Sequence, residues 1–120
     1  MSAPWIETDD LEERLARADA PEAHKAFARD LARDGLAVID LGDALLDLCD
    51  RIDAETAHHF EAGAKRVHDA WRRCPAIRQV ATHPEILACL TLAYGRKPFP
   101  FQSLNFHRGS QQGVGVDVLL

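Results

Sequence analysis

The pattern of apolar residues changes at Gly95, and this change limits the possible folds more than any other feature of the chain. Before Gly95, apolar side chains recur every three or four residues, which is the period of a helix that buries one side. From residue 99 onward they alternate instead, which is the period of a strand. Several helices followed by the first strands of a sheet predict the α+β fold class.

Residues 1–98 are expected to be mainly helical. Thr8 and Asp43 are the expected N-cap residues, and Gly35 and Gly95 stand where a left-handed residue would end a helix. The expected helices cover about residues 9–18, 21–34, 43–63, 65–73 and 84–94.

One short segment interrupts this helical pattern. The run LAVID, residues 36–40, is bounded by Gly35 and Gly42 and consists mostly of apolar and β-branched residues. A run of this kind is too short for a helix and is typical of a buried strand. We therefore expect one strand near residues 36–41.

Residues 99–120 are expected to form two further strands joined by a turn at Gly109. In the first strand Ser103, Asn105 and His107 share one face. A jelly-roll needs roughly eight strands to close and so leave no free sheet edge. Only the first strands are present in this sequence. The sequence therefore predicts N-terminal helices packed on the first strands of an incomplete double-stranded β-helix, in a single domain over residues 1–120. The exposed strand edge would allow self-association.

The composition excludes several classes of protein. The chain is 47% hydrophobic and 28% charged, and it has no apolar run near the roughly 20 residues that a membrane span needs. Its net charge of −5 disfavours nucleic acid as a partner, although residues 1–60 carry −9 and residues 61–120 carry +4. Its first residues are acidic and lack the apolar stretch of a secretory signal, so we expect a cytoplasmic protein.

The spacing of residues 115 and 117 has a chemical meaning on a strand. Side chains two apart project to the same face, so a histidine and an aspartate at this spacing can bind one cation. With a second, distant histidine they form the 2-His-1-carboxylate triad of non-haem iron oxygenases. Here the second position is Asp117, whereas the first is Gly115.

Three strings carry a resemblance to a known family. They are RDGLAVID at residues 33–40, HPEILACLTLAYGRKPFPFQ at residues 83–102 and PFQSLNFHRGSQQ at residues 100–112, the last followed by Asp117. Over about residues 24–120 the chain resembles the N-terminal part of the phytanoyl-CoA dioxygenase family. The resemblance implies a double-stranded β-helix, Fe(II) and 2-oxoglutarate as cofactors, and hydroxylation of a small-molecule substrate.

The resemblance also assigns roles to particular residues. Asp117 corresponds to the carboxylate ligand of the iron, and Gly115 occupies the position of the first histidine ligand. Gln102 and Asn105 correspond to polar residues that line the co-substrate pocket. The distal histidine and the arginine that holds the co-substrate lie beyond Leu120 in the family, so we expect this chain to be inactive.

Other residues leave alternatives open. His107 could stand in for the missing imidazole, and Glu55 with His58 has the Glu-x-x-His spacing of helical di-iron proteins. A third alternative is a small helical interaction module that pairs its terminal strands with the sheet of a partner. Arg72, Arg73 and Arg78 are interpreted as a solvated face. The three cysteines, Cys49, Cys74 and Cys89, are interpreted as buried thiols.

Overall fold

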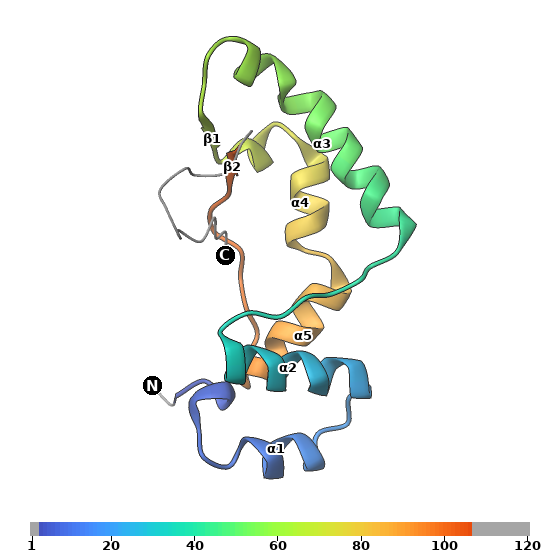
Figure 1. Ribbon diagram of the computed structural model, residues 1–120, viewed down its shortest axis with the longest axis vertical. Coiled ribbons are helices and arrows are strands. Elements are labelled where there is room, and N and C mark those ends of the chain that lie inside the picture. Colours follow the sequence, from blue (N-terminus) through green and yellow to red (C-terminus); the bar gives the residue numbers. More distant parts are fainter. Residues whose placement is uncertain (1–2, 107–120) are drawn as a thin grey trace. The chain divides into compact units, whose positions relative to one another are not determined.

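The computed structural model describes residues 3–106 and divides the chain into two compact units, each considered by itself (Figure 1). Unit 1 contains the described residues up to Leu41 together with His83–Phe99, and unit 2 contains Gly42–Thr82 and the segment that begins at Pro100. Helices and one two-stranded antiparallel sheet make up these units, in agreement with the expected α+β class.

The elements follow one another in an order that begins with short helices and ends with a strand. In chain order they are η1 (Trp5–Glu7), α1 (Leu11–Arg17), α2 (Glu22–Asp34), α3 (Asp43–Glu61), β1 (Arg66–His68), η2 (Ala70–Arg72), α4 (Pro75–Ala81), α5 (Pro84–Tyr94) and β2 (Leu104–Phe106).

Unit 1 is built around the packing of α2 on α5. Its core residues are Leu15 of α1, Ala28 of α2 and Ala93 of α5, and none of them has exposed surface. The two alanines allow the helices to approach closely, because the distance between helix axes depends on the side chains at the contact. Leu15 is the largest fully buried side chain among the described residues, so it contributes much of the apolar burial.

Two glycines end helices of unit 1 as the sequence predicts. Gly35 follows α2 and Gly95 follows α5, with φ angles of 73° and 71°, and the amide of each donates to the carbonyl four residues earlier. Only Gly95 is closely approached by another side chain, since a Cβ atom at this position would overlap the indole of Trp5. Glycine at residue 95 is therefore required both by the backbone and by packing.

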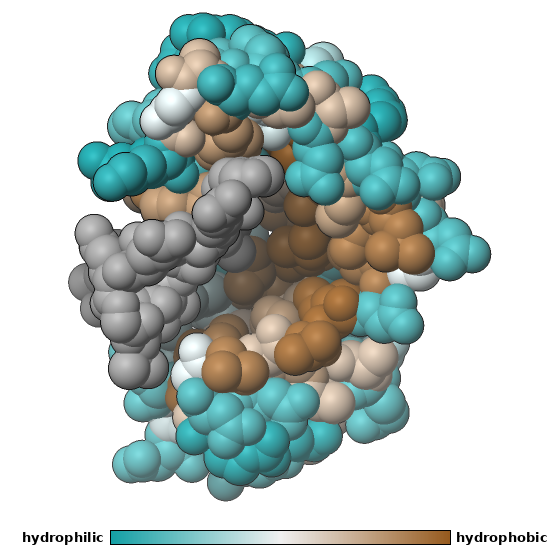
Figure 2. Space-filling model, turned by 45° about the horizontal axis from the view of Figure 1, so that its top comes forward, coloured by the Kyte–Doolittle hydropathy of each residue, from teal (hydrophilic) through white to brown (hydrophobic). Residues whose placement is uncertain are grey.

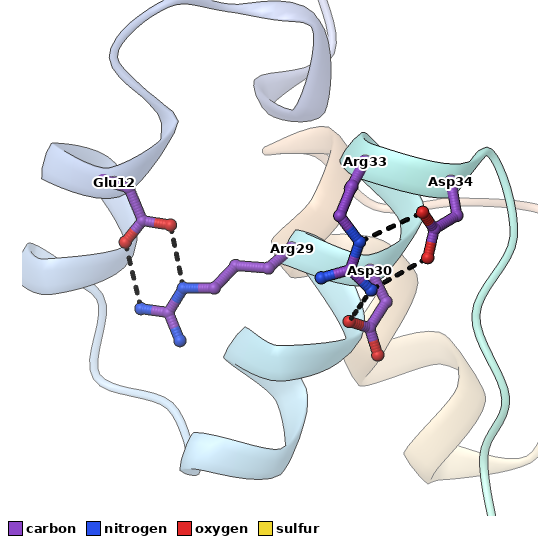
Figure 3. Close-up of polar contacts among 5 residues, drawn as sticks. All are labelled: Glu12, Arg29, Asp30, Arg33 and Asp34. Atoms are coloured by element: carbon purple, nitrogen blue, oxygen red, sulfur yellow. Dashed lines mark hydrogen bonds and ion pairs between the residues drawn. The ribbon is translucent and has the colours of Figure 1, made fainter.

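Three pairs of oppositely charged helix residues lie at exposed positions of unit 1, and Figure 3 shows their contacts among Glu12, Arg29, Asp30, Arg33 and Asp34. Arg29 of α2 donates two hydrogen bonds to the carboxylate of Glu12 in α1, of 2.8 and 3.1 Å. Arg33 binds Asp30 and Asp34 of its own helix. The bonds from Arg29 hold the pKa of Glu12 below its usual value. Because the charged side chains of these pairs are exposed, water screens their attraction, and the pairs contribute little to the stability of unit 1.

Unit 2 has its own core between α3 and α4. Ala76 and Ile77 of α4 are buried together with Ala70 and Cys74, and a group of partly buried hydrophobic side chains packs against them. That group is Leu48, Ile52, Val67 and Trp71. Pro75 is the first residue of α4, a position where proline loses no hydrogen bond.

The strand expected at residues 36–41 is not formed. The segment contains no helix or strand, and Leu36 to Ile39 make no backbone hydrogen bond to another described residue. Leu36 is 62% exposed and Val38 is 87% exposed. A strand needs a partner for its backbone groups, and the described residues supply none here. Figure 2 shows apolar side chains, in brown, among the hydrophilic surface residues.

The helix expected at residues 65–73 is also wrong. Residues 66–68 form β1, and the short helix η2 follows only after Asp69, whose φ of 52° interrupts any continuous helix. Pairing with β2 decides the conformation here, since tertiary contacts override weak local propensity. The expected helices also leave out α4, which begins at Pro75.

Two expected N-caps are placed differently. Thr8 ends η1, where its hydroxyl donates to the carbonyl of Trp5, and α1 begins after Asp10. Asp43 is the first residue of α3, and Gly42 occupies the N-cap position. Both helices nevertheless begin within three residues of the expected cap.

Residues 3–106 contain no helix that is long and apolar enough to cross a membrane.

Candidate functional site

The candidate site lies on the two-stranded sheet of unit 2, which carries Asn105. Strands β1 and β2 are antiparallel, and Val67 faces Asn105 at the centre of the ladder. Its two flanking pairs are Arg66 with Phe106 and His68 with Leu104. Because side chains alternate along a strand, Asn105 shares its face with Ser103, two residues earlier.

Two polar atoms on this face lack partners. The hydroxyl oxygen of Ser103 and the amide oxygen of Asn105 are buried, and neither has a hydrogen-bond partner among the described residues. A buried polar atom without a partner costs about 1–3 kcal/mol. The amide oxygen accepts hydrogen bonds, whereas the hydroxyl can donate or accept. These two atoms are therefore the ones on this face whose hydrogen bonding a polar partner would complete.

Asp69 makes two hydrogen bonds to Ser103, the residue just before β2. Its amide donates to the carbonyl of Ser103 at 2.8 Å, and its Oδ1 accepts from the amide of Ser103 at 3.0 Å. The indole of Trp71 donates to the same Oδ1 at 3.2 Å. The hydrogen bond from the Ser103 amide is the main reason why the pKa of Asp69 lies below its usual value, and the nearby His68 and Arg72 act in the same direction.

Asp69 was missed from the sequence because it was placed inside a helix. One signal could have found it: aspartate and asparagine enter the left-handed region more readily than other residues with a side chain. Asp69 is the only residue other than glycine with a positive φ in the described part of the chain. The positive φ of Asp69 turns the chain between β1 and η2.

The residues carried over from the family resemblance are not all brought together. Asn105 lies on β2 with its amide oxygen buried, whereas Gln102 is exposed and precedes the strand. Asp117 and Gly115 lie outside the described residues, as does His107. Residues 3–106 contain no group of three or more His, Cys, Asp or Glu side chains that could hold a metal ion.

The Glu-x-x-His spacing on α3 has a different use. Glu55 accepts a hydrogen bond of 2.6 Å from the buried thiol of Cys74, which precedes α4. His58 is exposed, and its ring lies 3.9 Å from that of His59 between centroids. Burial, reinforced by Glu55, raises the pKa of Cys74 and keeps it a neutral thiol. Glu55 therefore connects α3 to the core of unit 2.

The cysteines and arginines confirm most of the simpler interpretations. Cys74 and Cys89 are buried free thiols, whereas Cys49 is exposed, contrary to expectation. Burial is also the main reason why the pKa of Cys89 is raised. Arg72 and Arg78 are exposed and lie over the indole of Trp71, at 5.0 and 5.5 Å from its centroid. These arginines form a solvated face that packs on an aromatic ring.

One more titratable pair lies in unit 1. The buried His24 of α2 is hydrogen-bonded through Nε2 to Glu85 of α5 at 2.7 Å. Glu85 also lies in the first turn of α5, where its amide donates to Nδ1 of His83. The hydrogen bond between His24 and Glu85 links α2 to α5, the helices that also carry the buried Ala28 and Ala93, and it therefore supports the packing of these two helices.

Comparison of the chain with protein-family models, with curated proteins and with solved structures finds no match.

Proposed function

We propose that this chain corresponds to the N-terminal part of a phytanoyl-CoA dioxygenase-like hydroxylase, in a degenerate form that is not active by itself. The parent fold would be a double-stranded β-helix in a cytoplasmic protein. The intact enzyme would use Fe(II), 2-oxoglutarate and oxygen to hydroxylate an unactivated carbon of a small molecule.

The buried polar face of β2 is the observation that supports this proposal. The resemblance gives Asn105 a position in the co-substrate pocket, and its amide oxygen is buried without a partner beside the hydroxyl of Ser103. 2-Oxoglutarate carries two carboxylates and a keto group, all of which accept hydrogen bonds. The Ser103 hydroxyl can donate to these groups, whereas the unpartnered oxygen of Asn105 is itself an acceptor, so the amide would have to turn its NH₂ group toward the ligand.

The proposed lack of activity depends on the metal ligands. In the family the iron is held by two histidines and one carboxylate, and Gly115 supplies no imidazole beside Asp117. Because metal sites depend strictly on ligand number and geometry, one carboxylate would bind Fe(II) weakly. The chain would keep part of the scaffold without holding the metal.

An anaerobic titration with Fe(II) in the presence of 2-oxoglutarate tests this proposal. We expect no visible charge-transfer band at near-stoichiometric iron. Gly115→His should strengthen iron binding by adding an imidazole two residues from Asp117, and Asp117→Ala in the same background should remove the gain. A band from the unmodified chain would overturn the proposed inactivity, and a Gly115→His variant without any gain would count against the assignment of this strand.

A second candidate function is a small helical interaction module, expected from the sequence to pair its terminal strands with the sheet of a partner; an observation in unit 1 favours pairing through another segment. This pairing is favoured by the segment Leu36–Ile39, which lies outside any helix or strand, makes no backbone hydrogen bond to another described residue and exposes Val38 to 87%. Unpaired extended backbone is a template for strand addition, and exposed apolar side chains strengthen the contact.

Light scattering over a range of protein concentrations tests the second candidate. If the segment pairs with another chain, the average mass should rise with concentration, and Val38→Lys should reduce the rise because a lysine at an edge opposes pairing. Gln79→Lys is the matched control, since it adds the same charge at an exposed position of α4. A constant monomer mass for the unmodified protein would exclude self-pairing.

A further inference from the structure

The ladder between β1 and β2 continues by one pair beyond the residues that form the strands. The register that joins Val67 to Asn105 and His68 to Leu104 would next join Asp69 to Ser103. In antiparallel sheets every second pair of facing residues exchanges two backbone hydrogen bonds. The pair of Asp69 with Ser103 is at such a position, so a regular ladder would join it by two backbone bonds. Only one of its two bonds joins backbone to backbone, from the Asp69 amide to the Ser103 carbonyl.

The second bond is made by a side chain. The amide of Ser103 donates to Oδ1 of Asp69 at 3.0 Å, where a regular ladder would use the Asp69 carbonyl. The left-handed backbone of Asp69, with φ of 52°, turns the chain toward η2 at this residue. The carboxylate therefore replaces the carbonyl that the turn removes from the ladder.

The carboxylate is itself held in one orientation. The indole of Trp71 donates to the same Oδ1, and Trp71 packs on the core of unit 2. The other oxygen faces Nε2 of His68 at 3.7 Å. Glycine would adopt this backbone more easily but would supply no acceptor, so the position favours aspartate or asparagine.

We propose that Asp69 is a positioning residue that fixes the register of β2 through Oδ1 and thereby places the Ser103 and Asn105 side chains on the buried polar face of the sheet. That this face binds the co-substrate rests on the proposed function. The positioning itself concerns only the hydrogen bonds of β2 and stands without it.

Amide hydrogen exchange and cross-strand NMR contacts of the metal-free protein test the role of Asp69. Asp69→Asn keeps an oxygen at the same place without the charge, so Ser103 should keep its protection and Val67 its contact with Asn105. Asp69→Glu keeps the charge but moves the oxygen, so exchange at Ser103 should become about tenfold faster, as expected when one hydrogen bond is lost. Asp69→Gly should have the same effect although it relieves the backbone.

Two controls separate this role from a general loss of structure. Asp50→Ala removes an exposed carboxylate from α3 of the same unit and should leave Ser103 unchanged. Protection of the α3 and α4 amides reports whether unit 2 remains folded in each variant. The proposal is overturned if Asp69→Glu and Asp69→Gly keep the protection of Ser103, or if Asp69→Asn loses as much as they do. Neither result depends on iron or 2-oxoglutarate binding.

Discussion

Replacing Leu15 with alanine is expected to lower the free energy of unfolding of unit 1 by about 2–5 kcal/mol. Leu15 has no exposed surface and packs in the core that Ala28 and Ala93 share. The substitution removes buried methyl groups and leaves a cavity that the surrounding helices fill only in part. Small domains have stabilities of about 5–15 kcal/mol, so much of the stability of this unit would be lost.

Urea denaturation followed by tryptophan fluorescence measures this loss. A Trp71→Phe background leaves Trp5 of unit 1 as the only reporter, because the chain has two tryptophans. Leu36→Ala is the matched control: it makes the same chemical change where the side chain is 62% exposed, and it should change the stability by less than about 0.5 kcal/mol. Equal losses for the two variants would contradict the core assigned to unit 1.

Gly95→Ala is expected to destabilise unit 1 clearly more than Gly35→Ala. Both glycines end helices with nearly the same φ, 71° and 73°, so both substitutions add a left-handed strain of roughly 1–2 kcal/mol. At Gly35 the new methyl group meets nothing within 4 Å. At Gly95 it would overlap the Trp5 indole, which would have to move out of its place. Overpacking of this kind costs a further ~1–3 kcal/mol.

Thermal unfolding followed by circular dichroism compares the two variants without relying on tryptophan. Combining Gly95→Ala with Trp5→Ala provides an internal check. Once the indole is absent, the remaining effect of Gly95→Ala should fall to that of Gly35→Ala, because only the backbone strain is left. If Gly95→Ala costs no more than Gly35→Ala in the unmodified background, Trp5 does not pack against the end of α5.

The candidate site shows how far its residues could be predicted. The alternation after Gly95 correctly placed Asn105 on a strand, whereas its place in a co-substrate pocket stays a prediction from the family resemblance. Asp69 was not identified, because its role depends on a hydrogen bond to Ser103, 34 residues later in the chain. No local pattern around residue 69 reveals which distant amide its carboxylate accepts.

The sequence by itself determined the elements that depend on local signals. The apolar periods of α2, α3 and α5 predicted these helices, and Gly35 and Gly95 marked two of their ends, because a helix satisfies its hydrogen bonds within a few residues and glycine adopts the left-handed conformation without strain.

Only the tertiary structure decided which extended segments become strands. Residues 36–40 have the stronger strand pattern, yet they form no strand, and Leu36 to Ile39 make no backbone hydrogen bond to another described residue; Arg66–His68 was expected to be helical and pairs with β2. A strand makes its hydrogen bonds to another segment, so its formation depends on a partner that may be distant in sequence. The same dependence explains why Asp69, which replaces a backbone carbonyl in that pairing, was recognised only once β1 and β2 were seen side by side.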